Sequence, residues 1–401
     1  MPSRGARLRF YLVLASLTTL GPFSLDMYLP GLPALAKELG GTESTSQLTL
    51  TACLFGLGIG QLLAGPLSDT TGRRLPLMAG LVTYIVASIS CAAAPSIYLL
   101  IDFRLIQGMA GGAAAVIATA VVRDRYSGTA AARFFSLLLL VTLISPLLAP
   151  IFGGELLLLT SWRGEFLALA AIGVGVLLVA ALGLPETLPQ AQRHGGGLRS
   201  SLQTMGRLGA DRAFVSYALP AALAGGAIFA YLAGSSFVLE RVYGASPQVY
   251  GLLFALNGLA IGVSSQTNRW LLRRVSAESL FRGGLILLAT GGVALLVAVS
   301  LGFEGLAAIV VPVMVIIASN GFVGPNSLAL ALSPHPEAAG SGAALLGSLR
   351  VLFGGVMAPV VGIFGSSTAL PLAVTMCILC VGAGVAHVVV RPRSVDAVPA
   401  T

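Results

Sequence analysis

Two charged side chains lie inside long apolar stretches of the sequence. Asp26 lies near the end of the apolar stretch 8–29, and Arg104 lies within the apolar stretch 97–119. On insertion scales, a charge at the centre of a membrane-spanning helix costs about 2.5–3.5 kcal/mol, so such residues usually serve a function. A carboxylate and a guanidinium at similar depth can form an electrostatic pair, and the carboxyl can take up and release a proton. We therefore expect Asp26 and Arg104 to be the proton-coupling pair of this chain.

Other polar and aromatic side chains in the apolar stretches are candidates for contact with a small molecule. Small-molecule sites combine apolar and aromatic walls with a few polar groups. For each residue taken singly, packing between helices is an equally good interpretation. The candidates for a substrate cavity are Tyr28, Gln107, Phe229, Tyr231, Asn257, Asn320 and Asn326.

The composition places these residues in a membrane protein. Of 401 residues, 56% are hydrophobic and 9% are charged, which excludes an ordinary soluble domain. A helix needs about 20 apolar residues to span the hydrocarbon core of a bilayer. Twelve segments reach this length, and we expect each to be a transmembrane helix. They are 8–29, 47–67, 75–94, 97–119, 133–156, 163–184, 213–239, 249–268, 280–302, 306–331, 340–364 and 367–390.

The arginines predict the orientation of these helices. Basic residues concentrate in the cytoplasmic loops of membrane proteins. If the N-terminus lies inside, an even number of spans returns the C-terminus to the same side, and most arginines then fall in cytoplasmic segments. We expect a multi-pass protein of the inner (plasma) membrane with both termini in the cytoplasm. The positive charge therefore serves topology, and we expect no binding of nucleic acid.

The longest cytoplasmic connection, residues 187–212, divides the chain. It is rich in Gly, Gln and Arg and shows no apolar periodicity. Arg73-Arg74 in the first half is echoed by Arg273-Arg274 in the second, which indicates a degenerate internal repeat. We predict an all-α membrane protein of two pseudo-symmetric six-helix halves, 1–186 and 213–401, joined by this linker. Two related halves around a site at the membrane midplane are typical of transporters.

A short polar stretch connects the second and third predicted helices. Gly65 and Gly72 permit positive φ angles and close backbone approach. Asp69 can accept hydrogen bonds from the unpaired N–H groups at the start of a neighbouring helix. Arg73 and Arg74 are expected at the level of the lipid headgroups. We predict that these five residues form a conformational latch, which closes in only one of two transport states.

Two pairs of glycines recur at a spacing of four residues. Gly56 and Gly60 lie in the second predicted helix, and Gly108 and Gly112 lie in the fourth. Small residues at this spacing allow the backbones of two helices to approach closely. We interpret these glycines as packing residues.

The spacing G-x-L-x-D-x-x-G-R-R in the polar connection closely resembles the loop between helices 2 and 3 of the major facilitator superfamily. In the fourth helix, Arg104 and Gln107 belong to an R-x-x-Q-G sequence that resembles a second motif of the superfamily. The arginine of that motif is linked to proton coupling. The resemblance therefore implies the major facilitator fold.

The fifth predicted helix resembles the drug-antiporter motif of the superfamily. Ser or Ala replaces three of the motif's glycines, and Pro146 adds a further kink point; the matching residues include Pro146, Ala149, Pro150, Gly153 and Gly154. Residues 26–30, Trp162-Arg163 and Pro185-Glu186-Thr187 also match the bicyclomycin-resistance (Bcr/CflA) type of drug:proton antiporters, which includes amphenicol exporters.

This resemblance implies proton-coupled efflux of small amphipathic drugs by alternating access, with antibiotics such as chloramphenicol- or bicyclomycin-like compounds as substrates. The alternative is a proton-coupled transporter of a metabolite such as a sugar or an amino acid, working as an exporter or an importer. The expected partners are the drug, protons and the lipid bilayer, and we expect a monomer.

Other classes of function lack their residues. ATP-driven transport needs a P-loop lysine, and the single lysine, Lys37, lies in an outer loop without the glycines of that motif. An enzyme would need a nucleophile or metal constellation, but His194, His335 and His387 are scattered. The Cys377-x-x-Cys380 spacing lies in an apolar helix, where packing is the better interpretation. We therefore expect no enzyme, no metal and no cofactor.

Overall fold

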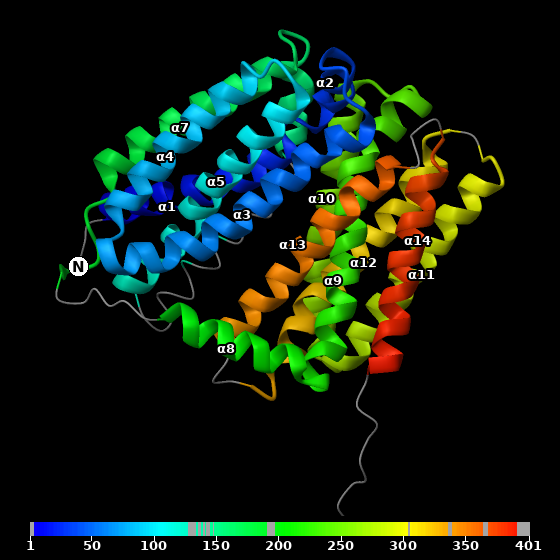
Figure 1. Ribbon diagram of the computed structural model, residues 1–401. Coiled ribbons are helices and arrows are strands. Elements are labelled where there is room, and N and C mark those ends of the chain that lie inside the picture. Colours follow the sequence, from blue (N-terminus) through cyan, green and yellow to red (C-terminus); the bar gives the residue numbers. More distant parts are fainter. Residues whose placement is uncertain are drawn as a thin grey trace, which may run out of the picture. The chain divides into compact units, whose positions relative to one another are not determined.

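The computed structural model of the chain describes residues 4–126, 134, 138, 141, 145–146, 148–190, 197–303, 305–335, 339–363 and 368–390. Every regular element in these ranges is a helix (Figure 1). The chain groups into two compact units.

The first unit comprises Met1–Gly197, Leu232–Leu259 and Ala358–Ala369. Four of its helices share a core in which Leu14, Leu81, Ile117 and Ala180 are fully buried. The described helices with defined bounds that precede residue 197 are α1 (Arg4–Asp26), η1 (Leu29–Gly31), α2 (Leu32–Glu38), α3 (Glu43–Thr71), α4 (Arg74–Ala92), α5 (Ile97–Arg125) and α7 (Trp162–Gly183).

Side-chain caps fix where α3 and α5 begin. Thr42 and Ser96 have extended backbones, and their hydroxyl oxygens accept hydrogen bonds from the backbone N–H groups of Thr45 and Leu99. Such caps satisfy donors that the first turn of a helix leaves unpaired. Helix α1 ends at Asp26, after which the chain turns through η1 into α2. This corner positions Asp26 at a helix end.

Helices α3 and α5 pack backbone against backbone, side by side in Figure 1. A Cβ atom on Gly56, Gly60, Gly108 or Gly112 would overlap a backbone carbonyl oxygen of the opposing helix. The interpretation of these glycines as packing residues is confirmed.

The second unit comprises Leu198–Tyr231, Ala260–Met357 and Leu370–Thr401. Helices α9, α10 and α13 contribute residues to both units. The described helices from residue 197 onward are α8 (Gly197–Ala210), α9 (Arg212–Ser236), the π-helix η3 (Phe237–Val242), α10 (Pro247–Leu271), α11 (Ala277–Ser300), α12 (Ala307–Leu332), α13 (Ala339–Ile363) and α14 (Leu370–Val390).

Helix α8 corrects one expectation from the sequence. The stretch 187–212 was expected to lack apolar periodicity, yet α8 occupies most of its second part. Leu208 of α8 is buried against a small apolar cluster with Phe214, Ala218 and Ala331. The leucines of this stretch follow a helical spacing, which the many polar residues between them obscure.

Ten stretches of the described residues are long and apolar enough to cross a membrane. Helix α13 has a shorter apolar stretch, Leu345–Val361, and the predicted span 133–156 lies partly outside the described residues. The predicted all-α membrane fold is confirmed. The boundary between the two halves at residues 187–212 stays a prediction.

Candidate functional site

Arg104 lies at the centre of a buried polar network in the first unit. Its guanidinium donates from Nη1 to Gln107 Oε1 at 2.6 Å and from Nε to the carbonyl oxygen of Thr49 at 3.4 Å. The Cζ atom lies 4.2 Å from the centroid of the Tyr28 ring and 5.6 Å from that of Phe166, distances at which an aromatic face attracts a cation. The remaining nitrogen, Nη2, has no hydrogen-bond partner among the described residues. The network therefore fixes the cation and leaves one donor free.

Gln107 extends this network towards α1. Its Nε2 donates to Ser88 Oγ at 2.8 Å, and the Ser88 hydroxyl donates to the carbonyl oxygen of Tyr84 at 2.7 Å. The Tyr84 hydroxyl and Ser24 Oγ of α1 share a further hydrogen bond of 2.7 Å. Side chains from α5, α4 and α1 thus fix the position of Gln107, which in turn orients Arg104.

Asp26 is 5% exposed at the end of α1. Its carboxylate forms no ion pair with Arg104 in this structure, although Arg104 lies close enough to act on it electrostatically. The aromatic face of Tyr28 and the amide of Gln107 take up the cation instead. A direct contact between Asp26 and Arg104 stays a prediction for another state of the protein.

The candidate cavity residues divide between the two units. Tyr28, Gln107 and Asn257 belong to the first unit. Tyr28 and Gln107 are fully buried in the network around Arg104, and the Tyr28 hydroxyl lies 3.0 Å from Thr49 Oγ1. In this structure these two side chains therefore contact Arg104 rather than line an open cavity.

The remaining candidates belong to the second unit. Asn326 donates to Asn268 Oδ1 at 2.7 Å, so the two amides join α12 to α10. Asn320 donates to a carbonyl oxygen of its own helix at 3.1 Å. Tyr231 is buried, and a Cβ atom on Gly354 would overlap the ring of Phe229. Several of these residues thus make hydrogen bonds or packing contacts within the unit, and a common substrate cavity stays a prediction.

An apolar cavity that the sequence did not predict lies next to the C-terminal end of α1 in the first unit. Its volume is about 400 Å³, within the range of small-molecule sites. One of its lining residues, Met27, directly follows Asp26 in the chain. The lining residues are Phe23, Met27, Phe152, Leu156, Ala168 and Ile172.

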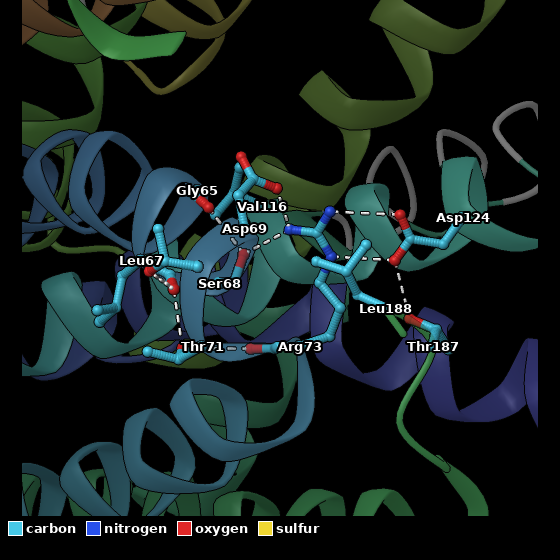
Figure 2. A network of polar contacts seen from close by, with 12 residues as sticks. Gly65, Leu67, Ser68, Asp69, Thr71, Arg73, Val116, Asp124, Thr187 and Leu188 are labelled. Carbon is cyan, nitrogen blue, oxygen red and sulfur yellow. Dashed lines mark hydrogen bonds and ion pairs between the residues drawn. The ribbon is translucent and has the colours of Figure 1, made fainter. Parts of the chain in front are cut away.

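Arg73 is the centre of a second polar network, at the connection between α3 and α4. Figure 2 shows its guanidinium between Asp69 on one side and Asp124 on the other. Nη1 binds Asp69 and donates to Ser68 Oγ at 2.7 Å, while Nε and Nη2 contact the two carboxylate oxygens of Asp124 at 3.0 and 3.3 Å. The Thr187 hydroxyl donates to Asp124 at 2.9 Å. Arg73 is only 6% exposed, so this network encloses its side chain, and its position at the headgroup level stays a prediction.

Glu186 caps the start of α4. Its carboxylate accepts hydrogen bonds from the backbone N–H groups of Arg73 and Arg74 at 2.9 and 3.1 Å. The N–H groups of Thr187 and Leu188 also donate to it. Partial burial by itself would raise the pKa of Glu186, but these four hydrogen bonds to the charged form outweigh it, and the pKa lies below its usual value.

The structure thus changes the roles within the predicted latch. From the sequence, Asp69 was a candidate acceptor for the start of a neighbouring helix. In this structure Asp69 pairs with Arg73, and Glu186 caps the start of α4. Gly72 has a φ of 94°, as predicted. Gly65 lies inside α3, and a Cβ atom there would meet its nearest neighbour only at 4.0 Å, so neither positive φ nor close approach requires this glycine. Arg74 donates to the carbonyl oxygen of Ala181 at 2.9 Å.

Part of the fifth predicted span lies outside the described residues, but Pro146, Ala149, Pro150, Gly153 and Gly154 lie within them. A Cβ atom on Gly153 would overlap the carbonyl oxygen of the residue that follows Asp26. Both glycines of the motif therefore mark close backbone contacts, because a Cβ atom on Gly154 would also lie 2.7 Å from a carbonyl oxygen at the start of α10. The role of this motif in antiport stays a prediction.

The sequence assigned no structural role to three acidic residues that are prominent in the structure. Asp124 and Glu186 complete the network around Arg73, and Glu165 is fully buried near the start of α7. Glu165 lies inside the predicted span 163–184, so the rule that selected Asp26 would also have selected it. Asp124 carries no such signal, because it lies beyond the end of its predicted span.

The chain matches the Major Facilitator Superfamily over residues 14–359. An uncharacterized MFS-type transporter of Bacillus subtilis, YdgK, is 39% identical and aligns over 94% of this chain and 93% of its own length. A bicyclomycin resistance protein homolog of Haemophilus influenzae is 28% identical over 92% of each chain. The multidrug resistance protein MdtL of Escherichia coli is 30% identical over 65% of this chain and 66% of its own.

Solved structures share the fold. A bacterial homolog of the human lysosomal transporter Spinster superposes with a TM-score of 0.76 at 16% identity, covering 97% of this chain and 96% of that one. A D-xylose–proton symporter has a TM-score of 0.76 at 15% identity, covering 96% and 97%. The chain therefore belongs to the Major Facilitator Superfamily, as a multi-pass membrane transporter rather than an enzyme, with relatives among the bicyclomycin- and multidrug-resistance proteins.

Proposed function

We propose that this transporter exports small amphipathic, antibiotic-like molecules from the cytoplasm in exchange for protons, by alternating access. The observation that carries the proposal is the burial of Asp26 next to the network of Arg104, without an ion pair between them. A carboxyl in this position changes the local charge when it binds or releases a proton. That change can favour one transport state over the other.

The Arg104 network explains how the protonation state of Asp26 would affect the contact between α1 and α5. Arg104 keeps Nη2 free of hydrogen bonds among the described residues, and a buried donor without a partner is costly. An ionised Asp26 that approached would satisfy this donor, whereas a protonated Asp26 would be attracted less. Exchange of the proton therefore switches an interaction between α1 and α5. The membrane potential contributes about 2.3 kcal/mol per charge per 100 mV to such a cycle.

The chemistry around Asp26 suits a neutral or weakly polar substrate. One acid and one base leave little net charge, and the cavity of about 400 Å³ beside Met27 has an apolar lining. The relatives named for resistance to bicyclomycin and to multiple drugs support an antibiotic-like substrate. Transport of a sugar or an amino acid is the competing proposal, and it would need more polar groups around the ligand.

The topology and the latch complete the proposal. The protein lies in the inner membrane as a monomer, with both termini in the cytoplasm, so the network around Arg73 lies on the cytoplasmic side. That network joins the ends of α3, α4 and α5 to the chain that follows α7. Its ion pairs would stabilise one transport state and break on the way to the other.

The test is transport into proteoliposomes with a panel of amphenicols, bicyclomycin, sugars and amino acids, with and without an imposed proton gradient. We expect at least one antibiotic to move against its gradient only when the proton gradient is present. Asp26→Asn should abolish that movement. Movement of a sugar or an amino acid alone, or drug movement that ignores the proton gradient, would overturn the proposal.

A further inference from the structure

Glu165 is a buried acid that the coupling network around Arg104 does not use. It has no exposed surface, and neither carboxylate oxygen has a hydrogen-bond partner among the described residues. Backbone surrounds it closely, because a Cβ atom on Gly31 would overlap Oε2 and one on Gly153 would lie 3.1 Å from Oε1. This carboxyl is therefore packed between the corner after α1 and the end of the fifth span.

A second acid faces the same place. Glu240 in η3 is the charged group that acts on Glu165 electrostatically, and its Oε1 is also buried without a partner. Both residues belong to the first unit. Two carboxylates that share a buried site cannot both be ionised without a large repulsion.

The cations nearest in sequence are engaged elsewhere. Arg163 pairs with Glu38 at 3.0 Å and donates to carbonyl oxygens at the end of α4. Arg241 pairs with Glu43 at 3.1 Å and donates to a carbonyl oxygen of α2. Neither guanidinium is hydrogen-bonded to Glu165 in the described part of the chain, although Arg241 acts electrostatically on Glu240. The remaining acid on this part of α2, Glu38, also accepts a hydrogen bond from Trp162 Nε1 at 2.7 Å.

The magnitudes favour a bound proton. Glu165 lies in the first turn of α7, where the helix dipole favours an anion only weakly. The cost of burying an unpaired ion is much larger than this gain. A neutral carboxylic acid avoids that cost, and loss of its proton would have to be accompanied by opening of the packing around it.

We infer that Glu165 and Glu240 form a second proton-binding site of this transporter, and that at least one of the two carboxyls carries a proton in the conformation described here. When the site opens to water, a carboxylate oxygen takes a proton from the medium. When the site opens again in the other state, the O–H bond breaks and the proton returns to water. The role in transport rests on the proposed proton-coupled function, but the bound proton can be measured without transport.

Infrared spectroscopy of the purified protein in lipid tests the bound proton directly. A protonated carboxyl has a carbonyl band that shifts in D2O, and ¹³C-labelling of glutamate alone shifts the band of a glutamic acid but not that of Asp26. We expect the unsubstituted chain at neutral pH to show a glutamate-dependent band. Absence of a label-dependent shift would overturn the inference, and this measurement needs no variant.

Variants then locate the proton. The double variant E165Q/E240Q should remove the band, whereas Glu155→Gln, at an exposed glutamate before α7, should leave it unchanged. An equal band in E165Q/E240Q and Glu155→Gln would overturn the assignment to this site.

Transport assays separate this inference from the proposed function. With a second proton site, E165Q/E240Q should move fewer protons per substrate than the parent and Glu155→Gln. An unchanged ratio would overturn the role in transport. If Asp26→Asn leaves drug transport intact while the glutamate band persists, the proposed coupling through Asp26 fails and the second site stands.

Discussion

Arg73 and Arg104 are both buried arginines of the first unit, but their surroundings differ in one respect. Arg73 has carboxylates on both sides, and Figure 2 shows its guanidinium paired with both Asp69 and Asp124. Arg104 has an amide, a carbonyl oxygen and two aromatic faces around it, and one of its nitrogens has no partner among the described residues. A cation whose donors all have partners stabilises one structure. A cation with an unpaired donor can form a new contact when the protein moves to another transport state.

Two glutamates repeat this contrast. Glu186 accepts hydrogen bonds from four backbone N–H groups and stays charged at the start of α4. Glu165 is buried more deeply and has no donor among the described residues. Function as a proton carrier is therefore expected at the groups whose charge is poorly satisfied, and a structural role at the others.

The largest effect is expected for Asp26→Asn. The amide cannot exchange a proton, so proton-driven drug export should be lost while expression and folding stay intact. The measurement is drug resistance of cells together with gradient-driven transport in proteoliposomes. Asp102→Asn is the matched control, because Asp102 is an exposed acid of α5. Full resistance in cells that carry Asp26→Asn would refute the coupling role.

Arg104 comes next. Arg104→Gln should change the pH dependence of transport, because Asp26 would lose the cation that acts on it. Arg104→Lys should do less harm if only the point charge matters, and nearly as much if the planar contacts with Gln107 and Tyr28 matter. The measurement is transport rate against pH for the parent and both variants. An unchanged pH profile at a reduced rate would show that Arg104 only supports the fold.

Substitutions around Arg73 should affect stability and the rate of alternation more than substrate affinity. Asp124→Asn should lower the free energy of unfolding by about 3 kcal/mol, the lower end for breaking a buried ion pair. Asp69→Asn should cost less than about 1 kcal/mol, because the Asp69 side chain is 51% exposed and that of Asp124 only 12%. Thermal unfolding measures the change in stability, and the rate of switching between transport states measures the change in alternation. Equal losses of stability in Asp124→Asn and Asp69→Asn would contradict the expected difference between the two ion pairs.

The smallest effect is expected for Glu186. Because its folded pKa lies below the unfolded value, the stabilisation is complete above the unfolded pKa and is lost as the pH falls through the folded pKa. Glu186→Gln should therefore lower stability slightly near neutral pH and remove part of the acid sensitivity below about pH 4.3. Unfolding of parent and variant between pH 3 and 7 measures this. If the curves of stability against pH for the parent and Glu186→Gln were parallel over the whole range, Glu186 would not act as a charged cap of α4.

Most of the fold follows from the sequence because membrane spans are a local property. About 20 apolar residues with few charges specify a transmembrane helix wherever they occur. The glycine pairs of α3 and α5 likewise predict close helix packing, since only small residues allow two helix backbones to approach closely. Asp26 and Arg104 could be selected for the same reason, because a charge in such a helix is visible without knowledge of its neighbours.

Only the tertiary structure decided which charges are satisfied. Arg73 and Glu186 are 113 residues apart in the chain, and Arg73 and Asp124 are 51 apart, so no local pattern pairs them. For the same reason no local pattern identifies Glu186 as the cap of α4, or shows that the Glu165 carboxyl has no hydrogen-bond partner among the described residues. Hydropathy depends on each residue alone, whereas the state of a buried charge depends on the donors that folding brings to it.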